Sequence, residues 1–589
     1  MNIILSTLNA KYIHTSLSIR YLKAYAEPDF VVKLAEYTIK DPIMNIVGDL
    51  YSKKPDVVGF SCYIWNIEET IEVIQTLKKI NPAITIILGG PEVTYDVSHW
   101  LDRIPEADFI VIGEGESTFK ELLAELKGER KQFGKIGGIA YRENDKKIIH
   151  PQISKLDLKE LPSPYRFAED QQHLSKRVTY IETSRGCPFN CQFCLSSIEV
   201  GVRYFDREKI KNDIRYLMEN GAKTIKFVDR TFNISRSYAM EMFQFLIDEH
   251  LPGTVFQFEI TADIMRPEVI QFLNDHAPAG LFRFEIGVQS TNDPTNELVK
   301  RKQNFEKLTR TVTMVKEGQK IDQHLDLIAG LPEEDYSTFR KTFNDVFELR
   351  PEELQLGFLK MLRGTGLKLR ASDHQYIYSD YSPYEILGNN VLSFDDIVRI
   401  KQVEDVLEKY WNDHRMNQTI EFLVTRVFDS AFDFFQEFGT YWDQQGWSRI
   451  GHQLEDLFRR LHQFLQDKKI AELDIAVGFM KYDYFNTQKY KPRKPWWEQS
   501  FEKAERTAIY ETILQNGAIL GEGYQNLQLN EKDLYKHTML EEIPFDLNEY
   551  LKKGSIVRAR GIMLSYFDPS GIGSSIFSYT EEKTLQANK

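Results

Sequence analysis

Two successive blocks of alternating strand-like and helix-like segments constrain the fold of this 589-residue chain more than any other feature. In the first block, helix-like stretches such as 68–80 separate short apolar runs that are typical of buried strands. These runs lie at 3–7, 31–34, 57–61, 85–88 and 109–112. Strands that alternate with helices predict an α/β fold, here a flavodoxin-like, doubly wound parallel sheet over residues 1–135.

The second block starts at Val178 and repeats the alternation with longer helical patterns, such as 235–250 and 336–349. Its candidate strands lie at 178–182, 224–228, 254–259, 282–288, 324–328 and 353–358. Six strand–helix units predict a partial (β/α)6 barrel over 177–370 rather than a complete eight-fold barrel. In both blocks, right-handed crossovers bring the C-terminal ends of the strands to one edge, where ligands bind in such folds.

The remaining segments differ in character. A looser, charged stretch lies at 127–176 and includes LPSPYRF with two prolines; we interpret it as a small hairpin and a linker, with the linker at 136–176. After residue 370, helix-like spacing predicts a mostly helical C-terminal domain over 371–589. Its segment 489–497, KYKPRKPWW, interleaves basic and aromatic residues. A charged surface loop with two aromatic anchors is favoured there over a grip on nucleic acid.

Composition narrows the functional classes. The net charge of −13 argues against broad, non-specific binding to nucleic acid, which requires a basic face. No apolar run approaches the roughly 18 residues of a membrane span, and the N-terminus lacks the basic and apolar parts of a secretory leader. We therefore expect a cytoplasmic protein. In a reducing compartment, clustered cysteines usually serve metal or redox chemistry.

Three of the four cysteines lie within eight residues. Cys187, Cys191 and Cys194 have the spacing Cys-x3-Cys-x2-Cys and follow the candidate strand 178–182 directly. A four-iron cluster held by three thiolates keeps one iron open, and an open coordination position is the mark of a catalytic centre. The alternatives are a zinc site with a distant fourth ligand and buried, inert cysteines.

This spacing, with Phe193 before the last cysteine, resembles the signature of the radical S-adenosylmethionine (SAM) family. The resemblance implies a 4Fe-4S cluster on Cys187, Cys191 and Cys194. Its open iron would chelate SAM, and one electron would cleave SAM to a 5′-deoxyadenosyl radical. Three strand ends strengthen the resemblance: DRTFN at 229–233, FEIGVQS at 284–290 and DLIAGLP at 326–332.

The resemblance also implies which side chains contact SAM. They are Phe193, Asp229, Glu285, Gln289 and Ser290. Two of them have plainer interpretations: Glu285 as a satisfied carboxylate inside the barrel, and Asp229 as the N-cap of the next helix.

A flavodoxin-like domain in front of such a barrel resembles the cobalamin-binding radical SAM enzymes. The segments that carry this resemblance end strands three to five: GFS at 59–61, LGGP at 88–91 and IGEGE at 112–116. Glycines there let a large ligand approach the backbone. The implied cobalamin contacts are Ser61, Gly89, Gly90, Gly113, Glu114 and Gly115.

One departure from that family concerns cobalt. Many cobalamin domains carry Asp-x-His-x-x-Gly, whose His is the lower cobalt ligand. The early loop here has only His14 and lacks the motif, so the lower face of cobalt is left unassigned. The alternative for the whole domain is a fold that kept its shape and lost its cofactor.

The resemblance implies an enzyme with three cofactors: the 4Fe-4S cluster, SAM and cobalamin. It would cleave SAM reductively and methylate or rearrange a substrate that the sequence does not identify, with electrons from a donor such as flavodoxin or ferredoxin. The alternatives are a radical SAM oxidoreductase or lyase without functional cobalamin, and an iron–sulfur redox sensor. The whole chain most resembles a bacterial branch of the cobalamin-binding group with its own C-terminal domain, an appendage that often covers the barrel mouth.

Overall fold

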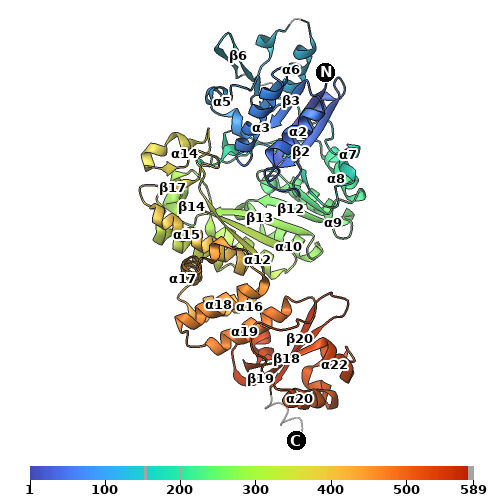
Figure 1. The fold of residues 1–589 in the computed structure, drawn as a ribbon, viewed down its shortest axis with the longest axis vertical. Coiled ribbons are helices and arrows are strands. Elements are labelled where there is room, and N and C mark those ends of the chain that lie inside the picture. The colour runs from blue at the N-terminus through green and yellow to red at the C-terminus, as the bar shows by residue number, and fades with distance from the viewer. Residues whose placement is uncertain (130, 152–154, 199–200, 581–589) are drawn as a thin grey trace. The chain divides into compact units, whose positions relative to one another are not determined.

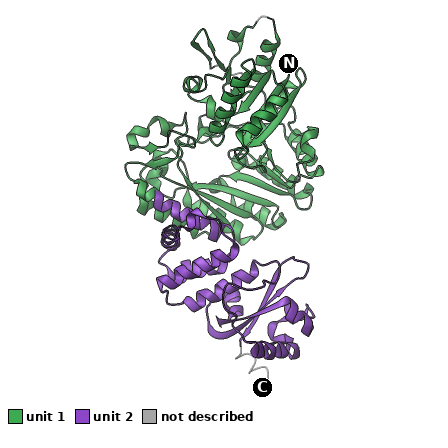
Figure 2. Cartoon of the chain, in the orientation of Figure 1, with its two compact units in different colours: residues 1–397 green, residues 398–589 purple. Residues whose placement is uncertain are grey.

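The computed structural model describes residues 1–129, 131–151, 155–198 and 201–580. The chain divides into two compact units, residues 1–397 and residues 398–589, which Figure 2 shows in different colours. Within the described residues, no helix combines the length and the apolar character needed to cross a membrane.

The first unit begins with a seven-stranded sheet in the order β2-β1-β3-β4-β5-β6-β7. Its first five strands are parallel and confirm the predicted runs: β1 (Ile3–Asn9), β2 (Val32–Thr38), β3 (Val57–Ser61), β4 (Thr85–Gly89) and β5 (Phe109–Val111). The main helices between them are α1 (Leu17–Ala26), α2 (Ile43–Ser52), α3 (Ile67–Ile80), α5 (Val97–Arg103) and α6 (Glu116–Lys127). This confirms the doubly wound, flavodoxin-like arrangement (Figure 1).

Helices cover both faces of this sheet. Ile4 on β1 belongs to an apolar cluster with side chains of α2, α3 and α5, whereas its neighbours Ile3 and Leu5 belong to a second cluster with α1 and α6. Successive strand residues point to opposite faces, so a strand covered on both faces carries apolar side chains on both. This explains the apolar run Ile3–Leu5 at the start of β1.

The predicted hairpin is present and extends this sheet. Strands β6 (Ile139–Glu143) and β7 (Lys146–His150) pair with each other, and β6 pairs antiparallel with β5. The first sheet therefore continues beyond residue 135, through part of the segment interpreted as a linker.

A second sheet of six parallel strands follows in the order β15-β14-β13-β12-β11-β8. The strands are β8 (Val178–Ile181), β11 (Thr224–Phe227), β12 (Val255–Ile260), β13 (Phe282–Gln289), β14 (Asp322–Ala329) and β15 (Glu353–Phe358). The helices that connect or flank them include α8 (Arg207–Glu219), α9 (Arg236–Glu249), α10 (Pro267–His276), α12 (Phe305–Glu317) and α13 (Tyr336–Phe347). Six strand–helix units in this order confirm the partial barrel (Figure 1).

The barrel strands have one apolar and one polar face. Along β13 the buried residues Phe282 and Phe284 pack on Phe243 of α9, while Glu285 and the alternate positions are only half-buried. Strands β12 and β14 show the same alternation. The polar face lies away from the helices, so the inside of the barrel is lined with polar side chains.

The second unit is mostly helical, as predicted, with α16 (Asn417–Phe422), α17 (Ala431–Gln444), α18 (Leu454–Lys468), α19 (Leu473–Asn486) and α20 (Lys503–Gln515). It also contains an antiparallel sheet that the sequence analysis did not predict: β18 (Thr538–Phe545), β19 (Arg558–Phe567) and β20 (Ser574–Thr580). The two tryptophans of segment 489–497 pack inside this unit, Trp496 on His462 and Trp497 on Phe485, with ring centroids 5.2 and 5.3 Å apart. This agrees with a surface loop anchored by aromatic rings.

Candidate functional site

A cavity of about 820 Å³ lies in the first unit, between the C-terminal ends of the first sheet and the first strands of the barrel. Its size falls within the roughly 300–1,000 Å³ of typical ligand pockets. One wall of the cavity, called the first-sheet wall, is formed by lining residues whose numbers lie between 5 and 119. It consists mainly of glycines, residues with hydroxyl groups and apolar side chains. The opposite wall, called the barrel wall, is formed by lining residues whose numbers lie between 180 and 259. Its charged side chains are Glu182, Arg185, Lys226, Arg230 and Glu259.

All six residues implied as cobalamin contacts line this cavity. They are Ser61, Gly89, Gly90, Gly113, Glu114 and Gly115. Gly90 has φ +108°, and a Cβ atom there would lie 2.5 Å from the Cys62 carbonyl oxygen, so only glycine fits. The turn itself therefore requires glycine at position 90, and the glycines of this edge give it little side-chain bulk, which is compatible with a large ligand.

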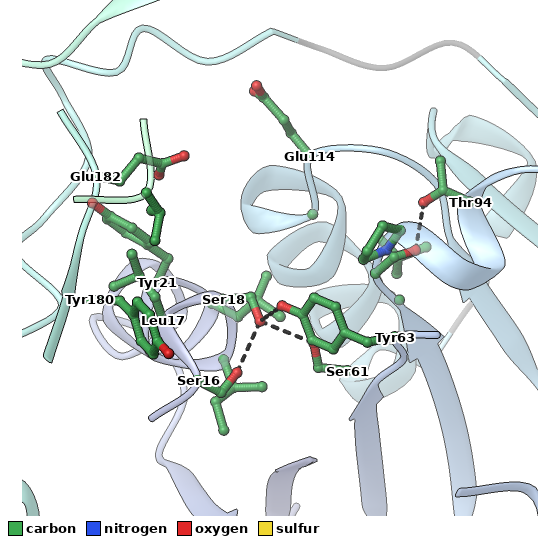
Figure 3. Close-up of a pocket in the computed structure, with 18 of the residues that line it drawn as sticks. Ser16, Leu17, Ser18, Tyr21, Ser61, Tyr63, Thr94, Glu114, Tyr180 and Glu182 are labelled. Atoms are coloured by element: carbon green, nitrogen blue, oxygen red, sulfur yellow. Dashed lines mark hydrogen bonds between the residues drawn. The ribbon is translucent and has the colours of Figure 1, made fainter. Parts of the chain in front are cut away.

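Hydroxyl groups cluster on the first-sheet wall (Figure 3). Ser18 Oγ lies 3.0 Å from Ser61 Oγ, 3.1 Å from Tyr63 Oη and 3.1 Å from Ser16 Oγ. The Tyr63 ring stacks on Trp65 with centroids 4.3 Å apart. The sequence analysis missed these residues, although a run of serines before α1 and two aromatics after β3 were visible signals. They offer polar contacts beside an apolar slot, as ligand sites commonly do.

His14 also lines the cavity, and its Nδ1 lies 2.7 Å from the hydroxyl oxygen of Tyr180 on β8. Burial lowers the pKa of His14, and the positive charges of Lys11 and Lys226 lower it further. The imidazole is therefore neutral near pH 7 and bonded to the barrel. The lower face of cobalt stays unassigned.

The cysteine loop follows β8 and begins at Gly186, whose φ of +95° turns the chain. The Gln192 N–H donates to the Val299 carbonyl, and the Leu367 N–H donates to the Gln192 carbonyl, both at 2.8 Å. These bonds attach the loop to the segments that follow β13 and β15. Gly186 lines the cavity, as do Leu195 and Ser196 just after Cys194.

Two of the three thiols, those of Cys187 and Cys191, have the surroundings expected of cluster ligands. Cys187 and Cys191 are each only 8% exposed. Burial raises the pKa of both thiols, while Arg230 opposes the rise at Cys187 and Arg301 opposes it at Cys191. The Arg301 Nη1 atom lies 4.0 Å from Cys191 Sγ. A thiolate needs such positive neighbours when it is removed from water.

Over the described residues, no three or more His, Cys, Asp or Glu side chains come together in a way that would hold a single metal ion. The donor set of this loop is three thiols. A four-iron cluster binds each thiolate at a different iron, which spreads the sulfurs more widely than a single ion does. Each of the three thiols would hold one iron of such a cluster.

Asp229 does not line the cavity. It is buried, and its carboxylate accepts bonds from the Thr183 hydroxyl at 2.7 Å, from the Thr183 N–H at 3.1 Å and from the Ser184 hydroxyl. It holds the turn that leads into the cysteine loop. The N-cap interpretation is wrong, because Ser235 caps α9.

The β13 residues differ in their surroundings. Glu285 accepts bonds from Lys226 Nζ at 2.6 and 2.7 Å, which makes it a satisfied carboxylate inside the barrel. The Ser290 hydroxyl donates to Glu334 at 2.5 Å, where burial raises the pKa of Glu334 to about 7. Gln289 has φ +69°, and its buried Oε1 has no bonded partner among the described residues. Gln289 thus offers an acceptor for a ligand; Phe193 lies half-buried in the cysteine loop.

Several charged residues of the site were not predicted. Arg301 donates to the Gly287 carbonyl beside the cysteines, and no signal in a single sequence marks it. Lys226 and Glu259 alternate with the apolar residues of β11 and β12, so the polar face of these strands could have revealed them.

Family models match three consecutive parts of the chain. The B12 binding domain matches residues 4–123, the radical SAM superfamily matches residues 181–346, and the protein of unknown function DUF4080 matches residues 372–564. The first two matches lie on the two sheets that meet at the cavity.

Known relatives include methyltransferases. The chain is 27% identical over 354 residues to 2-(S-pantetheinyl)-carbapenam-3-carboxylate methyltransferase of Streptantibioticus cattleyicolor, which covers 56% of this chain and 50% of the relative. It is 26% identical over 377 residues to the cobalamin-dependent radical SAM methyltransferase TokK of Streptomyces tokunonensis, which covers 60% of this chain and 54% of TokK. The chain thus spans about half the length of the curated relatives it matches.

Among solved structures, the cobalamin-dependent SAM radical enzyme OxsB with aqua-cobalamin bound superimposes with a TM-score of 0.57. The two are 16% identical, and the match covers 82% of this chain and 80% of OxsB. At this identity the likeness shows a shared fold. The chain therefore carries, in this order, a B12 binding domain, a radical SAM domain and a DUF4080 domain.

Proposed function

We propose that this protein is a cobalamin-dependent radical SAM enzyme that transfers a methyl group to its substrate. One observation carries the proposal: a single cavity is lined both by the glycine edge of the B12 binding domain and by Gly186, Leu195 and Ser196, which flank the cluster cysteines. Cobalamin bound there, together with SAM on the cluster, would supply a carbon-centred radical and a transferable methyl group. The methyltransferase names of two relatives support this outcome over other radical reactions.

The chain's own residues have distinct parts in this proposal. Cys187, Cys191 and Cys194 hold the cluster, and the positive charge of Arg301 favours the thiolate form of Cys191. The buried Oε1 of Gln289 is an acceptor for the amino or hydroxyl groups of SAM. The glycine edge and the hydroxyl cluster around Ser18 bind the cobalamin.

The substrate lies, in this proposal, against the barrel wall. Lys226, Arg230 and Glu259 line it, so a hydrophilic substrate with charged groups is favoured over a purely apolar one. The cluster needs one electron for each SAM that is cleaved. We infer a small electron-transfer protein such as flavodoxin or ferredoxin as the donor.

Anaerobic reconstitution tests the proposal. The full chain is supplied with iron, sulfide, cobalamin, SAM and a reductant, and 5′-deoxyadenosine and S-adenosylhomocysteine are quantified. Both products are expected, the second because methyl transfer from SAM leaves S-adenosylhomocysteine. If 5′-deoxyadenosine forms equally with and without cobalamin and no S-adenosylhomocysteine appears, the protein is instead an oxidoreductase or lyase. If neither product forms on a fully loaded cluster, the sensor alternative holds.

A further inference from the structure

Arg185 occupies an unusual place at the start of the cysteine loop. It lies two residues before Cys187 on the short strand β9 (Ser184–Arg185), which pairs antiparallel with β10 (Arg203–Tyr204). Its side chain is only 13% exposed. A guanidinium so far removed from water needs several partners, because burying an unpaired charge is very costly.

Three carboxylates supply these partners. Arg185 Nη2 lies 2.7 Å from Glu116 Oε1, Nε lies 3.0 Å from Glu182 Oε2, and Nη1 lies 3.7 Å from Glu114 Oε2. Glu182 belongs to the barrel, whereas Glu114 and Glu116 belong to the loop between β5 and α6. Figure 3 shows Glu182 and Glu114 on the two sides of the same pocket. The Arg185 guanidinium thus connects the barrel to the domain that contains the first sheet.

The loop that Arg185 holds is the predicted cobalamin loop. Glu114 lies between Gly113 and Gly115, and Glu116 begins α6 directly after them. A second arginine, Arg203 on β10, also pairs with Glu114. The carboxylates of this loop therefore point to barrel arginines, and the loop is attached to the barrel at two places.

Aromatic rings restrict the guanidinium further. Its central carbon lies 5.3 Å from the ring centroid of Tyr21 and 5.6 Å from that of Phe205. These two rings stack with centroids 5.9 Å apart. Tyr21 belongs to α1 of the first domain and Phe205 follows β10, so the rings also come from both sides. Little freedom remains for the Arg185 side chain.

We propose that Arg185 is a positioning residue that holds the predicted cobalamin loop, residues 112–116, at a fixed distance from the cysteine loop, which holds the predicted cluster. This inference rests on the proposed function. Only arginine offers a planar fork whose separate N–H groups reach several carboxylates at once, whereas a lysine is a single point donor. Fixed spacing matters because small displacements of reacting groups sharply reduce rates.

The test is the Arg185→Lys variant of the full chain, loaded anaerobically with cob(II)alamin and a reduced 4Fe-4S cluster. Both centres are paramagnetic, so pulsed EPR reports the distribution of their separation. We expect a narrow distribution in the wild type and a broadened one in Arg185→Lys. The Kd for cobalamin, measured by absorbance titration, is expected to rise about tenfold. A loss of folding alone would change neither the distribution nor the Kd of the folded fraction.

Arg177→Lys is the matched control. Arg177 Nη1 lies 2.9 Å from Glu36 Oε2, and its side chain is 11% exposed, so this arginine also joins the start of the barrel to the first sheet. It does not contact the loop at 112–116. We expect its melting temperature to fall by an amount similar to that of Arg185→Lys, with the cobalt–cluster distribution and the Kd unchanged.

An unchanged distribution and Kd in Arg185→Lys would overturn the inference, and so would equal broadening in Arg177→Lys. Glu116→Gln tests the same contact from the other side and replaces Arg185→Lys if that variant does not fold. We expect the cobalt–cluster distance distribution to broaden less in Glu116→Gln than in Arg185→Lys. If Arg185→Lys does not fold, an unbroadened distribution in Glu116→Gln would overturn the inference. A wild-type chain that takes up neither cobalamin nor a cluster would instead refute the proposed function, and this inference with it.

Discussion

The two walls of the cavity differ in chemistry. The first-sheet wall is made of bare backbone, hydroxyls and apolar side chains, and its Glu114 and Glu116 are paired with barrel arginines. The barrel wall presents charged side chains, among them Lys226, Arg230 and Glu259. A wall of glycines and uncharged side chains admits a large ligand by its shape, whereas a charged wall selects a ligand by its electrostatics. One cavity therefore combines two kinds of recognition, and substitutions in the two walls should affect different measured properties.

The largest effect is expected for substitutions in the cysteine loop, which lies beside the barrel wall. Replacing Cys187, Cys191 and Cys194 together by alanine should abolish iron uptake and 5′-deoxyadenosine formation, because no other thiolates lie in the loop. Cobalamin uptake on the other wall should persist. Iron analysis, EPR and product quantification measure this. Cys62→Ala is the control, since Cys62 is buried in the first sheet, and full iron content in the triple variant would contradict the cluster assignment.

On the barrel wall itself, Lys226→Met leaves Glu285 as an unpaired, half-buried carboxylate. We expect the free energy of unfolding to fall by about 1–2 kcal/mol, less than for a fully buried ion pair. Denaturant unfolding measures it, and the double variant Lys226→Met with Glu285→Leu should recover most of the loss. Cobalamin affinity should stay unchanged. An equal loss of cobalamin affinity would erase the distinction between the walls.

On the first-sheet wall, Gly90→Ala forces a side chain into a left-handed backbone position against the Cys62 carbonyl. The free energy of unfolding should fall by about 2 kcal/mol, and the cobalamin Kd should rise. Gly48→Ala on α2 is a matched control, because a Cβ there meets nothing within 4 Å. That control should raise stability by about 0.5–1 kcal/mol. A normal Kd in Gly90→Ala would show that cobalamin does not approach this edge.

The smallest effect concerns the polar face of the barrel strands. Burial tends to lower the pKa of His324, but bonds to Asp326 and Glu353 outweigh it and raise the pKa to about 9. A pKa raised above its ordinary value of 6.5 stabilises the fold below that pH, and the stabilisation is lost as pH rises through about 9.

The free energy of unfolding should therefore fall by about 2 kcal/mol between these pH values. His324→Gln should flatten this fall, and unfolding curves at several pH values measure it. Identical pH profiles for the wild type and His324→Gln would show that the imidazole is not held in its charged form.

Much of the architecture was predictable because its signals are local. The strand β3 and the strand β15 have the bounds read from their apolar runs. The antiparallel sheet of the second unit was missed because strands such as β18 carry charged residues beside apolar ones and follow helices without a clear break. Pattern reading is weakest for such short mixed segments.

Residue roles were harder to predict than positions. The contacts of Asp229 and Ser290 with SAM stay predictions; in the structure both side chains bond to protein groups, whereas the buried Oε1 of Gln289 has no bonded partner among the described residues. The glycine edge was predictable, since strand ends with glycine are recognisable without knowledge of distant neighbours. Which side chain a carboxylate meets depends on partners far away in the chain.

The sequence by itself determined the order of the three domains, the two parallel sheets and the spacing of the three cysteines, because apolar periodicity and short motifs are local properties. Only the tertiary structure decided how the charges are paired. Arg185 and Glu116 are 69 residues apart in the chain, and Lys226 and Glu285 are 59 apart. Nothing in a single sequence ranks one such pair over another, since every buried charge accepts whichever opposite charge the packed strands bring within reach.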